Sequence, residues 1–216
     1  MKIAVEGYPF IIGSLIPGAA LAGLYPVHGW LSLLIIGLVL LSLGLFCTAF
    51  FRNPERAVPT GDDVLVSPAD GKIVQVLEIN DDFVGEAYRV DIFLSVFDVH
   101  LNRIPTTGKI EFVNYRPGKF ISAFKDKAST DNERTDIGIS VSRGRLRVAQ
   151  IAGLIARRIV CRVKKNDTVT KGQLYGLIRF GSRTEISFPR CYRPCVEPGQ
   201  RVKGGETIVG RLAESA

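Results

Sequence analysis

Three residues of this 216-residue chain carry the side-chain types that together activate a hydroxyl group. Ser182 lies between two strand-like runs, His100 is the one histidine outside an apolar N-terminal segment, and Asp70 lies in a Pro-Ala-Asp-Gly turn. A carboxylate, an imidazole and a hydroxyl are the groups that convert serine into a nucleophile. Each residue also has an ordinary structural interpretation, because Asp-Gly is a common turn dipeptide and a histidine at a strand end is often only solvated. The sequence does not show that the three meet.

The elements that must position these residues are short strands. Beyond residue 63 the chain consists of runs rich in Val, Ile, Tyr and Phe, separated by Gly, Asn, Asp and Pro, and it has no long amphipathic helix. This pattern predicts a mainly β domain, a barrel or sandwich, over residues 64–216. The expected strands lie within residues 71–79, 88–97, 109–115, 136–142, 145–153 and 173–180.

An internal echo supports the barrel. Residues 163–173 and 196–206 share Val, a turn, Val six positions on and Gly nine positions on, with an offset of 33. This resembles the hairpin unit of lipoyl and biotinyl carrier folds. A carrier presents a lysine in a motif such as Met-Lys-Met, and the only methionine here is Met1. The echo therefore favours lipoyl-like hairpin architecture without a carrier function.

The first 51 residues predict a membrane hairpin. Residues 7–51 form a stretch of 45 residues without Asp, Glu, Lys or Arg, and a spanning helix needs roughly 20. Two helices therefore fit, with a turn at residues 26–29, although two prolines and three glycines leave the first one either spanning or re-entrant. A cleaved signal peptide is the competing interpretation, but the apolar run is far too long for one.

Charge sets the expected location. Lys2 precedes the first span, Arg52 and Arg56 follow the second, and the turn between has neither Lys nor Arg, which places both ends in the cytoplasm at the cell membrane. Residues 1–51 hold one Lys and one Glu, so the net charge of +7 belongs to residues 52–216, after a linker at 52–63. A tethered basic domain is attracted to anionic lipid. Nucleic acid is not an expected partner, because no recognition helix, stacking set or zinc module accompanies the charge.

The cysteines predict free thiols. Cys47, Cys161, Cys191 and Cys195 form no Cys-x-x-Cys pair, and the chain has only two histidines. A metal site is therefore not expected. Reduced thiols agree with a cytoplasmic domain.

Five motifs occur in order between residue 50 and the C-terminal part of the chain: FFRNPER, VSPADGKIVQV, VFDVHLNRIP, PGKFISAFKDKASTDNER and GLIRFGSRTEISFP. One such motif would be weak, whereas five at these intervals are specific. From about residue 50 to the C-terminus they make the chain resemble the short-form phosphatidylserine decarboxylase proenzymes, which depend on a pyruvoyl group. An N-terminal membrane hairpin is also usual in that family.

The resemblance implies self-cleavage between Gly181 and Ser182 into a β chain, residues 1–181, and an α chain, residues 182–216, which stay together as a heterodimer. Ser182 would become a pyruvoyl group that forms a Schiff base with phosphatidylserine and yields phosphatidylethanolamine, without metal or pyridoxal phosphate. Glycine suits the cleavage because it hinders its carbonyl little and tolerates strained backbone. His100, oriented by Asp70, would act as base and later as acid.

The chain departs from the family pattern at two positions. Long-form relatives carry a second histidine three residues after the first, where this chain has Arg103, and Thr135 follows the Asn-Glu-Arg motif where Asn is expected. Cations near the motifs could hold an anionic substrate, although strand cations are more often only solvated. These weaker substrate-binding candidates are Arg103, Arg134, Arg179 and Arg183.

Three alternatives stay open at this point. A membrane-anchored serine hydrolase would use Asp70, His100 and Ser182 in one intact chain. A non-catalytic membrane-tethered barrel would serve as an adaptor and would not need Ser182. Within the resembled family, an archaeal-type lipid with a serine headgroup, as in archaetidylserine decarboxylases, is an alternative substrate because the serine moiety carries the chemistry.

Overall fold

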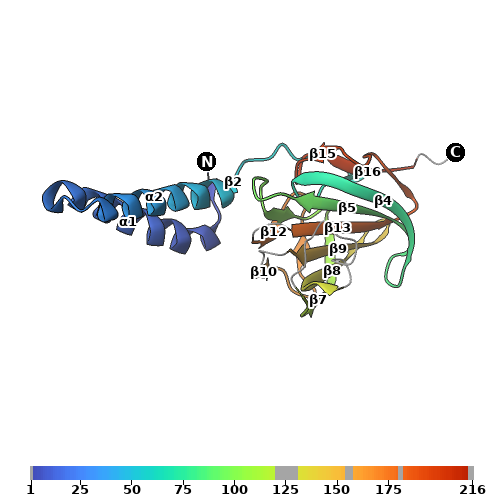
Figure 1. The fold of residues 1–216 in the computed structure, drawn as a ribbon. Coiled ribbons are helices and arrows are strands. Elements are labelled where there is room, and N and C mark those ends of the chain that lie inside the picture. Colours follow the sequence, from blue (N-terminus) through green and yellow to red (C-terminus); the bar gives the residue numbers. More distant parts are fainter. Residues whose placement is uncertain (1, 120–130, 154–157, 180–181, 214–216) are drawn as a thin grey trace. The chain divides into compact units, whose positions relative to one another are not determined.

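The computed structural model describes residues 2–119, 131–153, 158–179 and 182–213 (Figure 1). The chain divides into two compact units, Met1–Glu55 and Arg56–Ala216. The first unit is helical and the second is built of strands, so the prediction of a mainly β protein with an N-terminal helical pair is confirmed.

The N-terminal unit is a pair of apolar helices. Helix α1 (Tyr8–His28) follows a short 3-10 turn η1 (Val5–Gly7), and α2 (Leu31–Phe50) returns beside it. Two-residue strands β1 (Lys2–Ile3) and β2 (Arg52–Asn53) pair at the base of the hairpin. Both helices are long and apolar enough to cross a membrane, with mean hydropathies of 1.7 and 2.6.

The turn of this hairpin differs from the prediction at residues 26–29. Helix α1 continues through Pro26 to His28, and the chain reverses at Gly29, whose φ is +66°. Where the helices cross, Gly18 and Gly37 face each other so closely that a Cβ on Gly37 would lie 2.7 Å from the backbone nitrogen of Ala22. Small residues at such a crossing let apolar helices pack backbone to backbone.

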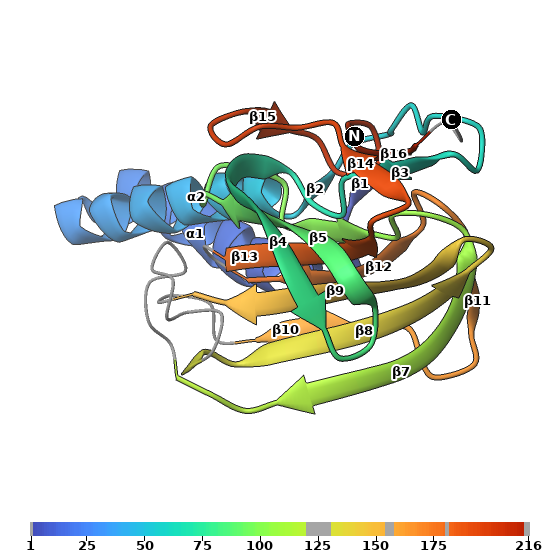
Figure 2. The same cartoon turned by 90° about the vertical axis from the view of Figure 1, so that its right-hand side faces the viewer.

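The second unit is dominated by one curled antiparallel sheet of eight strands, whose curl Figure 2 shows. The strand order is β11-β7-β8-β9-β13-β5-β4-β15. The bounds are β4 (Gly71–Asp81), β5 (Gly85–Leu94), β7 (Gly108–Arg116), β8 (Arg134–Val141), β9 (Gly144–Ala152), β11 (Thr168–Val169), β13 (Ser182–Pro189) and β15 (Arg201–Val202).

Two three-stranded sheets complete the domain, in the orders β10-β12-β6 and β14-β16-β3. Their strands are β3 (Val64–Val66), β6 (Leu101–Arg103), β10 (Ile159–Cys161), β12 (Leu174–Ile178), β14 (Tyr192–Pro194) and β16 (Ile208–Leu212).

Successive side chains of a strand point to opposite faces, and this alternation divides the large sheet into an apolar and a charged face. Val90, Ile186, Val148 and Ile137 are aligned across β5, β13, β9 and β8, and all four are fully buried. They belong to one hydrophobic core. We call this side of the large sheet the core face.

The echo at an offset of 33 corresponds to two matching hairpins at opposite edges of the large sheet. Asn166 and Gly199 both have positive φ, 76° and 93°. The amide of Asn166 donates to the carbonyl of Ile110 on β7, and the amide of Gly199 donates to the carbonyl of Ile73 on β4. The strands that receive them, β4 and β7, also begin alike, with Gly-Lys-Ile. The domain therefore contains an internal repeat, and each copy consists of a strand that begins Gly-Lys-Ile and one of these hairpins. The echo in the sequence covers only the hairpins.

Candidate active site

Ser182 is the first residue of β13, the strand at the middle of the large sheet. It lies opposite Leu94 of β5 and Ala152 of β9, and it is fully buried. Its Oγ has no hydrogen-bond partner among the described residues. Gly181, the other half of the predicted cleavage site, lies outside the described residues. A buried hydroxyl left without a partner costs about 1–3 kcal/mol, so its presence calls for an explanation.

A buried polar network lies on the same face as this hydroxyl. Thr184 is two residues further along β13, and its Oγ1 accepts a hydrogen bond from Nδ2 of Asn102 at 3.1 Å. Oδ1 of Asn102 accepts one from Nε2 of Gln150 at 2.8 Å. All three residues are 0% exposed. Three polar side chains in an otherwise apolar core therefore adjoin Ser182.

His100 immediately precedes β6 and is buried at 1% exposure. Its Nδ1 lies 2.9 Å from the carbonyl oxygen of Asp98. A carbonyl only accepts, so Nδ1 carries the proton, and in the neutral ring Nε2 is the basic nitrogen. The carbonyl of His100 in turn accepts the amide of Ile178, four residues before Ser182. The backbone thus places His100 beside the segment that leads to the predicted cleavage site.

Asp70 is held by Arg56, a residue of the FFRNPER motif. Nη2 of Arg56 lies 2.9 and 2.8 Å from the two carboxylate oxygens of Asp70, and the side chain of Arg56 is only 5% exposed. Burial raises the pKa of Asp70, and the nearby Asp98 adds to this, whereas Arg56 and the amide of Gly204 lower it; the net direction is upward. The described hydrogen bonds of Asp70 go to Arg56 and Gly204, and none of them goes to His100.

The internal repeat shows that Asp70 also has a structural role. Its Oδ1 accepts the amide of Gly204 at 2.8 Å. At the equivalent position of the other half, Oγ1 of Thr107 accepts the amide of Lys171 at 3.2 Å. The Asp70 carboxylate therefore joins two segments that are 134 residues apart, and none of its described hydrogen bonds caps its own turn. The difference between the halves is the charge: Asp70 carries a carboxylate that pairs with Arg56, whereas Thr107 is uncharged. Glu206 lies at 3.9 Å from Arg56 as a second carboxylate.

Arg103 stands where long-form relatives are expected to carry a second histidine. It lies in a cluster of charged residues with Arg56, Asp70 and Glu206. Its Nη1 donates to the carbonyl of Gly172 at 3.0 Å. Burial, and then the charge of Arg56, lower its pKa, while Asp70 and Glu206 oppose that change. Arg103 thus supplies positive charge near Asp70, which an uncharged histidine would not.

Arg183 and Arg134 lie on the charged face, opposite the core face that Ser182 occupies. Arg183 is 0% exposed and its Nη1 lies 3.5 Å from Oδ2 of Asp91, so the idea that it is merely solvated is wrong. Arg134 pairs with Asp136 and, at 3.7 Å, with Glu185. Because the sheet separates both guanidinium groups from Ser182, their placement counts against direct contact with a substrate there.

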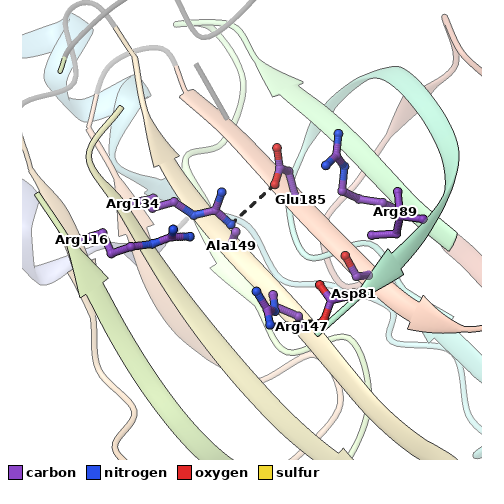
Figure 3. A pocket seen from close by; sticks show the side chains of 9 residues that line it. Asp81, Arg89, Arg116, Arg134, Arg147, Ala149 and Glu185 are labelled. Atoms are coloured by element: carbon purple, nitrogen blue, oxygen red, sulfur yellow. Dashed lines mark ion pairs between the residues drawn. The ribbon is translucent and has the colours of Figure 1, made fainter. Parts of the chain in front are cut away.

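Around these pairs the charged face is hollowed into a cavity of about 150 Å³ (Figure 3). Arginines line it, but carboxylates neutralise them, as the pairs Arg134–Glu185 and Arg147–Asp81 show. The cavity is therefore lined by an ion-pair network, and its arginines are not left over to bind an anion. The charged residues that line it are Asp81, Arg89, Arg116, Arg134, Arg147 and Glu185.

The Asn-Glu-Arg motif is hydrogen-bonded to β9, the strand that pairs with Ser182. Asn132, in the Asn-Glu-Arg motif, donates from Nδ2 to the carbonyl of Ala152 at 2.7 Å, and the amide of Ala152 donates to the carbonyl of Glu133. The motif therefore fixes the end of β9 that lies opposite Ser182. Arg179 is half-buried, and its amide donates to the carbonyl of Arg158.

The structure thus places His100 just before β6 and Ser182 at the start of β13, two strands joined by the hydrogen bond from Asn102 to Thr184. It keeps Asp70 with Arg56. Among the described residues no hydrogen bond joins the three, and no group of side chains suited to a metal ion occurs there. The residues missed from the sequence are Arg56, Asn102, Gln150 and Thr184. Three of them lie inside the motifs that carried the resemblance, and their membership was the available signal.

The fold and site define a mainly β domain with a buried serine hydroxyl that has no partner in the described part of the chain, joined to a pair of apolar helices long enough to cross a membrane. A family model described as phosphatidylserine decarboxylase matches residues 43–210. The chain therefore belongs to the phosphatidylserine decarboxylase family, and the resemblance is confirmed.

Curated relatives extend this match over most of the chain. The phosphatidylserine decarboxylase proenzyme of Nitratidesulfovibrio vulgaris is 50% identical over 82% of this chain and 82% of its own. That of Carboxydothermus hydrogenoformans is 48% identical over 88% of this chain and 91% of its own. That of Symbiobacterium thermophilum is 46% identical over 98% and 96%.

Proposed function

We propose that this chain is a proenzyme that cleaves itself between Gly181 and Ser182 and then, as a pyruvoyl enzyme, decarboxylates phosphatidylserine to phosphatidylethanolamine. The observation that carries the proposal is the buried, unpartnered Oγ of Ser182 at the start of β13. Its support is membership of a family whose curated members are named proenzymes.

In the first step Oγ of Ser182 attacks the carbonyl carbon of Gly181. The new bond joins Oγ to that carbon, the carbon–nitrogen bond breaks, and the hydroxyl proton ends on the nitrogen, so the amide becomes an ester. The base is His100, whose Nε2 is basic because Nδ1 donates to the carbonyl of Asp98. Asp70 acts from further away, through its charge and through Arg56.

Maturation is completed by loss of a proton from the α carbon of residue 182 and departure of the Gly181 carboxylate from its β carbon. Hydrolysis of the resulting dehydroalanine then releases ammonia and leaves a pyruvoyl group at the N-terminus of the α chain. The hydroxyl fits this role because it is buried and has no partner among the described residues, and because its strand is joined through Thr184 to Asn102, two residues after His100. When formed, the group supplies an electron sink for the pair released as carbon dioxide leaves.

The two products of cleavage should stay together. Residues 182–216 contain β13, which pairs along its length with β5 and over most of it with β9, and also contain β15 and β16, which pair with β4 and β3. Separating them would break backbone pairing in two sheets, the large one and the sheet that contains β3 and β16. We therefore expect a stable heterodimer of β and α chains.

The lipid substrate agrees with the N-terminal helices. The two apolar helices are long enough to tether the domain to a bilayer. From the flanking cations Lys2 and Arg52 we infer that the domain lies on the cytoplasmic face. Arg103 and Arg179 are the cations we propose for the carboxylate or phosphate of the substrate, because neither lies on the charged face. The serine headgroup carries the reacting carboxylate and amine in either a bacterial or an archaeal-type lipid.

The first test is an intact mass spectrum of the full chain under denaturing conditions, followed by conversion of phosphatidylserine in mixed micelles. Two chains, with a modified N-terminus at residue 182, and formation of phosphatidylethanolamine are the expected results. Ser182→Ala should give one uncleaved, inactive chain. A single intact wild-type chain labelled at Ser182 by a serine-directed reagent would instead favour the hydrolase, and full function of Ser182→Ala would favour the adaptor.

A further inference from the structure

Gln150 has a buried acceptor that the protein leaves unused. It lies on the core face of β9, opposite Thr184 in β13, and is 0% exposed. Its Oε1 has no hydrogen-bond partner among the described residues, as Oγ of Ser182 also has none. Two such atoms in one part of a core are unusual, because nearly all buried polar groups are paired.

The orientation of the Gln150 amide is fixed by its neighbours. Nε2 lies 2.8 Å from Oδ1 of Asn102 and 3.3 Å from the carbonyl oxygen of Val160. The carbonyl of Val160 can only accept, so the NH₂ group must face it, and a flipped amide would place two oxygens together. Both amide hydrogens are then used, and Oε1 is left as an acceptor.

Asn102 is fixed in the same way. Its Oδ1 receives Gln150, so its Nδ2 is directed to Oγ1 of Thr184 at 3.1 Å. This chain of hydrogen bonds runs from β9 through β6 to β13. These hydrogen bonds hold the NH₂ group of Gln150 and so fix the position of its oxygen, Oε1.

The sheet register places Ser182 diagonally from Gln150. Oγ and Oε1 are not hydrogen-bonded to each other in this structure, so the contact requires the serine side chain to turn. Ser182 pairs with Ala152, and Gln150 lies two residues before Ala152 on the same face. Ser182 and Gln150 are therefore diagonal neighbours, about 7–8 Å apart at their backbones, a separation that long side chains bridge. A hydroxyl is both donor and acceptor, so the donor that Oε1 lacks is present on Ser182.

We propose that Gln150 is a positioning residue for self-cleavage: its Oε1 accepts the hydroxyl hydrogen of Ser182 and so sets the direction of Oγ before attack. This rests on the proposed function. An amide oxygen is far too weakly basic to take the proton, which goes to a separate base. The bonds made and broken are those of the first step above, so the role of Gln150 is geometric.

The strand beside Gln150 shows how closely its amide is packed. A Cβ added to Gly176 of β12 would lie 2.8 Å from Nε2 of Gln150 and 2.2 Å from the carbonyl oxygen of Val160. Glycine at this position thus makes room for the hydrogen bond between them. The same crowding means that a substitution of Gln150 must keep its volume.

The test measures the self-cleavage of full-length chains synthesised in a cell-free system with detergent micelles. Cleavage is followed by denaturing gel and intact mass after translation is stopped. Gln150→Met keeps the volume and removes the acceptor, and Gln75→Met is the matched control, because Gln75 bonds Asp91 and not this network. We expect cleavage to slow at least about tenfold in Gln150→Met, which corresponds to about 1.4 kcal/mol, and to be unchanged in Gln75→Met.

Two further readouts separate positioning from a loss of structure. Gln150→Glu, kept protonated by burial, retains one donor and one acceptor and should restore most of the cleavage. Hydroxylamine cuts esters, so the slow Gln150→Met chain should resist it, because the arrest precedes ester formation. If Gln150→Met does not fold, as judged by its thermal melting, Gln150→Asn replaces it, since its shorter amide withdraws the oxygen and should also slow cleavage.

The outcomes distinguish this inference from the function on which it rests. Cleavage of wild type with equally fast cleavage of Gln150→Met, or of Gln150→Asn where that variant is used, overturns the role of Gln150 alone. Hydroxylamine-sensitive accumulation in the variant also overturns it, because the first step would then be intact. An uncleaved wild-type chain overturns the proposed function itself.

Discussion

The side chains of Ser182 and Arg183, neighbours in β13, lie on opposite faces of the same sheet. Ser182 is on the core face near Thr184, and Arg183 is on the charged face with Asp91. Both are 0% exposed. The buried hydroxyl of Ser182 and the buried guanidinium of Arg183 are therefore separated by the strand itself, so in the proposed enzyme chemistry and anchoring are divided between the two faces.

The anchoring role gives the first prediction. Arg183→Met should lower the free energy of unfolding by about 3 kcal/mol, because it leaves Asp91 buried with one partner fewer. After maturation this should appear as a lower temperature at which the β and α chains separate, measured by thermal melting of the purified heterodimer. Arg190→Met is the control, since its pair with Glu78 is exposed and should contribute less than about 1 kcal/mol. Equal melting of the two variants would show that Arg183 does not anchor the strand.

His100 should be required for catalysis. His100→Ala removes the proposed base and acid, and we expect both self-cleavage and decarboxylation to fall by roughly 10²–10⁴. His28→Ala is a direct control, because His28 is the other histidine of the chain and ends helix α1. Cleavage is read by denaturing gel and decarboxylation by formation of phosphatidylethanolamine. Full turnover of His100→Ala would remove His100 from the mechanism.

Asp70→Asn should slow self-cleavage while the fold is retained. The asparagine oxygen can still accept the amide of Gly204, so this long-range hydrogen bond survives, but the carboxylate charge of Asp70 is lost, and of the described carboxylates Arg56 keeps only Glu206, at 3.9 Å. Thr107 shows that an uncharged acceptor is sufficient for the hydrogen bond at the equivalent position. The measurement is the cleavage time course beside a thermal melt. Normal maturation with a normal melt would reduce Asp70 to a structural residue.

The same substitution should change the pH dependence of stability. Burial raises the pKa of Asp70 above its ordinary 3.8, despite Arg56. Between the ordinary pKa and the raised pKa the folded chain therefore binds more protons than the unfolded chain. The contribution of Asp70 to the free energy of unfolding is then present at lower pH and is lost as pH rises through the raised pKa. Relative to wild type, Asp70→Asn should gain stability over this range in denaturant titrations in detergent. Parallel curves would contradict the raised pKa.

The helical hairpin offers a test by matched glycines. Gly37→Leu should separate α1 from α2, because even a Cβ at this position would lie 2.7 Å from the backbone of Ala22. Gly23→Leu is the control, since a Cβ there meets nothing within 4 Å. We expect Gly37→Leu alone to reduce the fraction of protein that stays monodisperse in mild detergent on heating. Equal behaviour would mean that the close crossing is not needed for the pair.

Local patterns in the sequence were sufficient to predict that the chain contains an apolar helical pair and a β domain. The uncharged stretch of residues 7–51 predicted the helical pair, and alternating apolar residues with turn signals predicted the β domain, because both depend on neighbours in the chain. The paired hairpins at 163–173 and 196–206 were visible for the same reason. The five motifs identified the family and pointed to Gly181 and Ser182.

The tertiary structure decided which residues face one another. Asp70 was predicted to orient His100, yet among the described residues its carboxylate is engaged by Arg56 and His100 by the carbonyl of Asp98. The network of Gln150, Asn102 and Thr184 comes from three strands far apart in the sequence. Strand order and register set such contacts, and these depend on long-range pairing that no local pattern encodes. The sequence by itself therefore determined the kinds of groups present, and the sheet determined which side of it each group occupies.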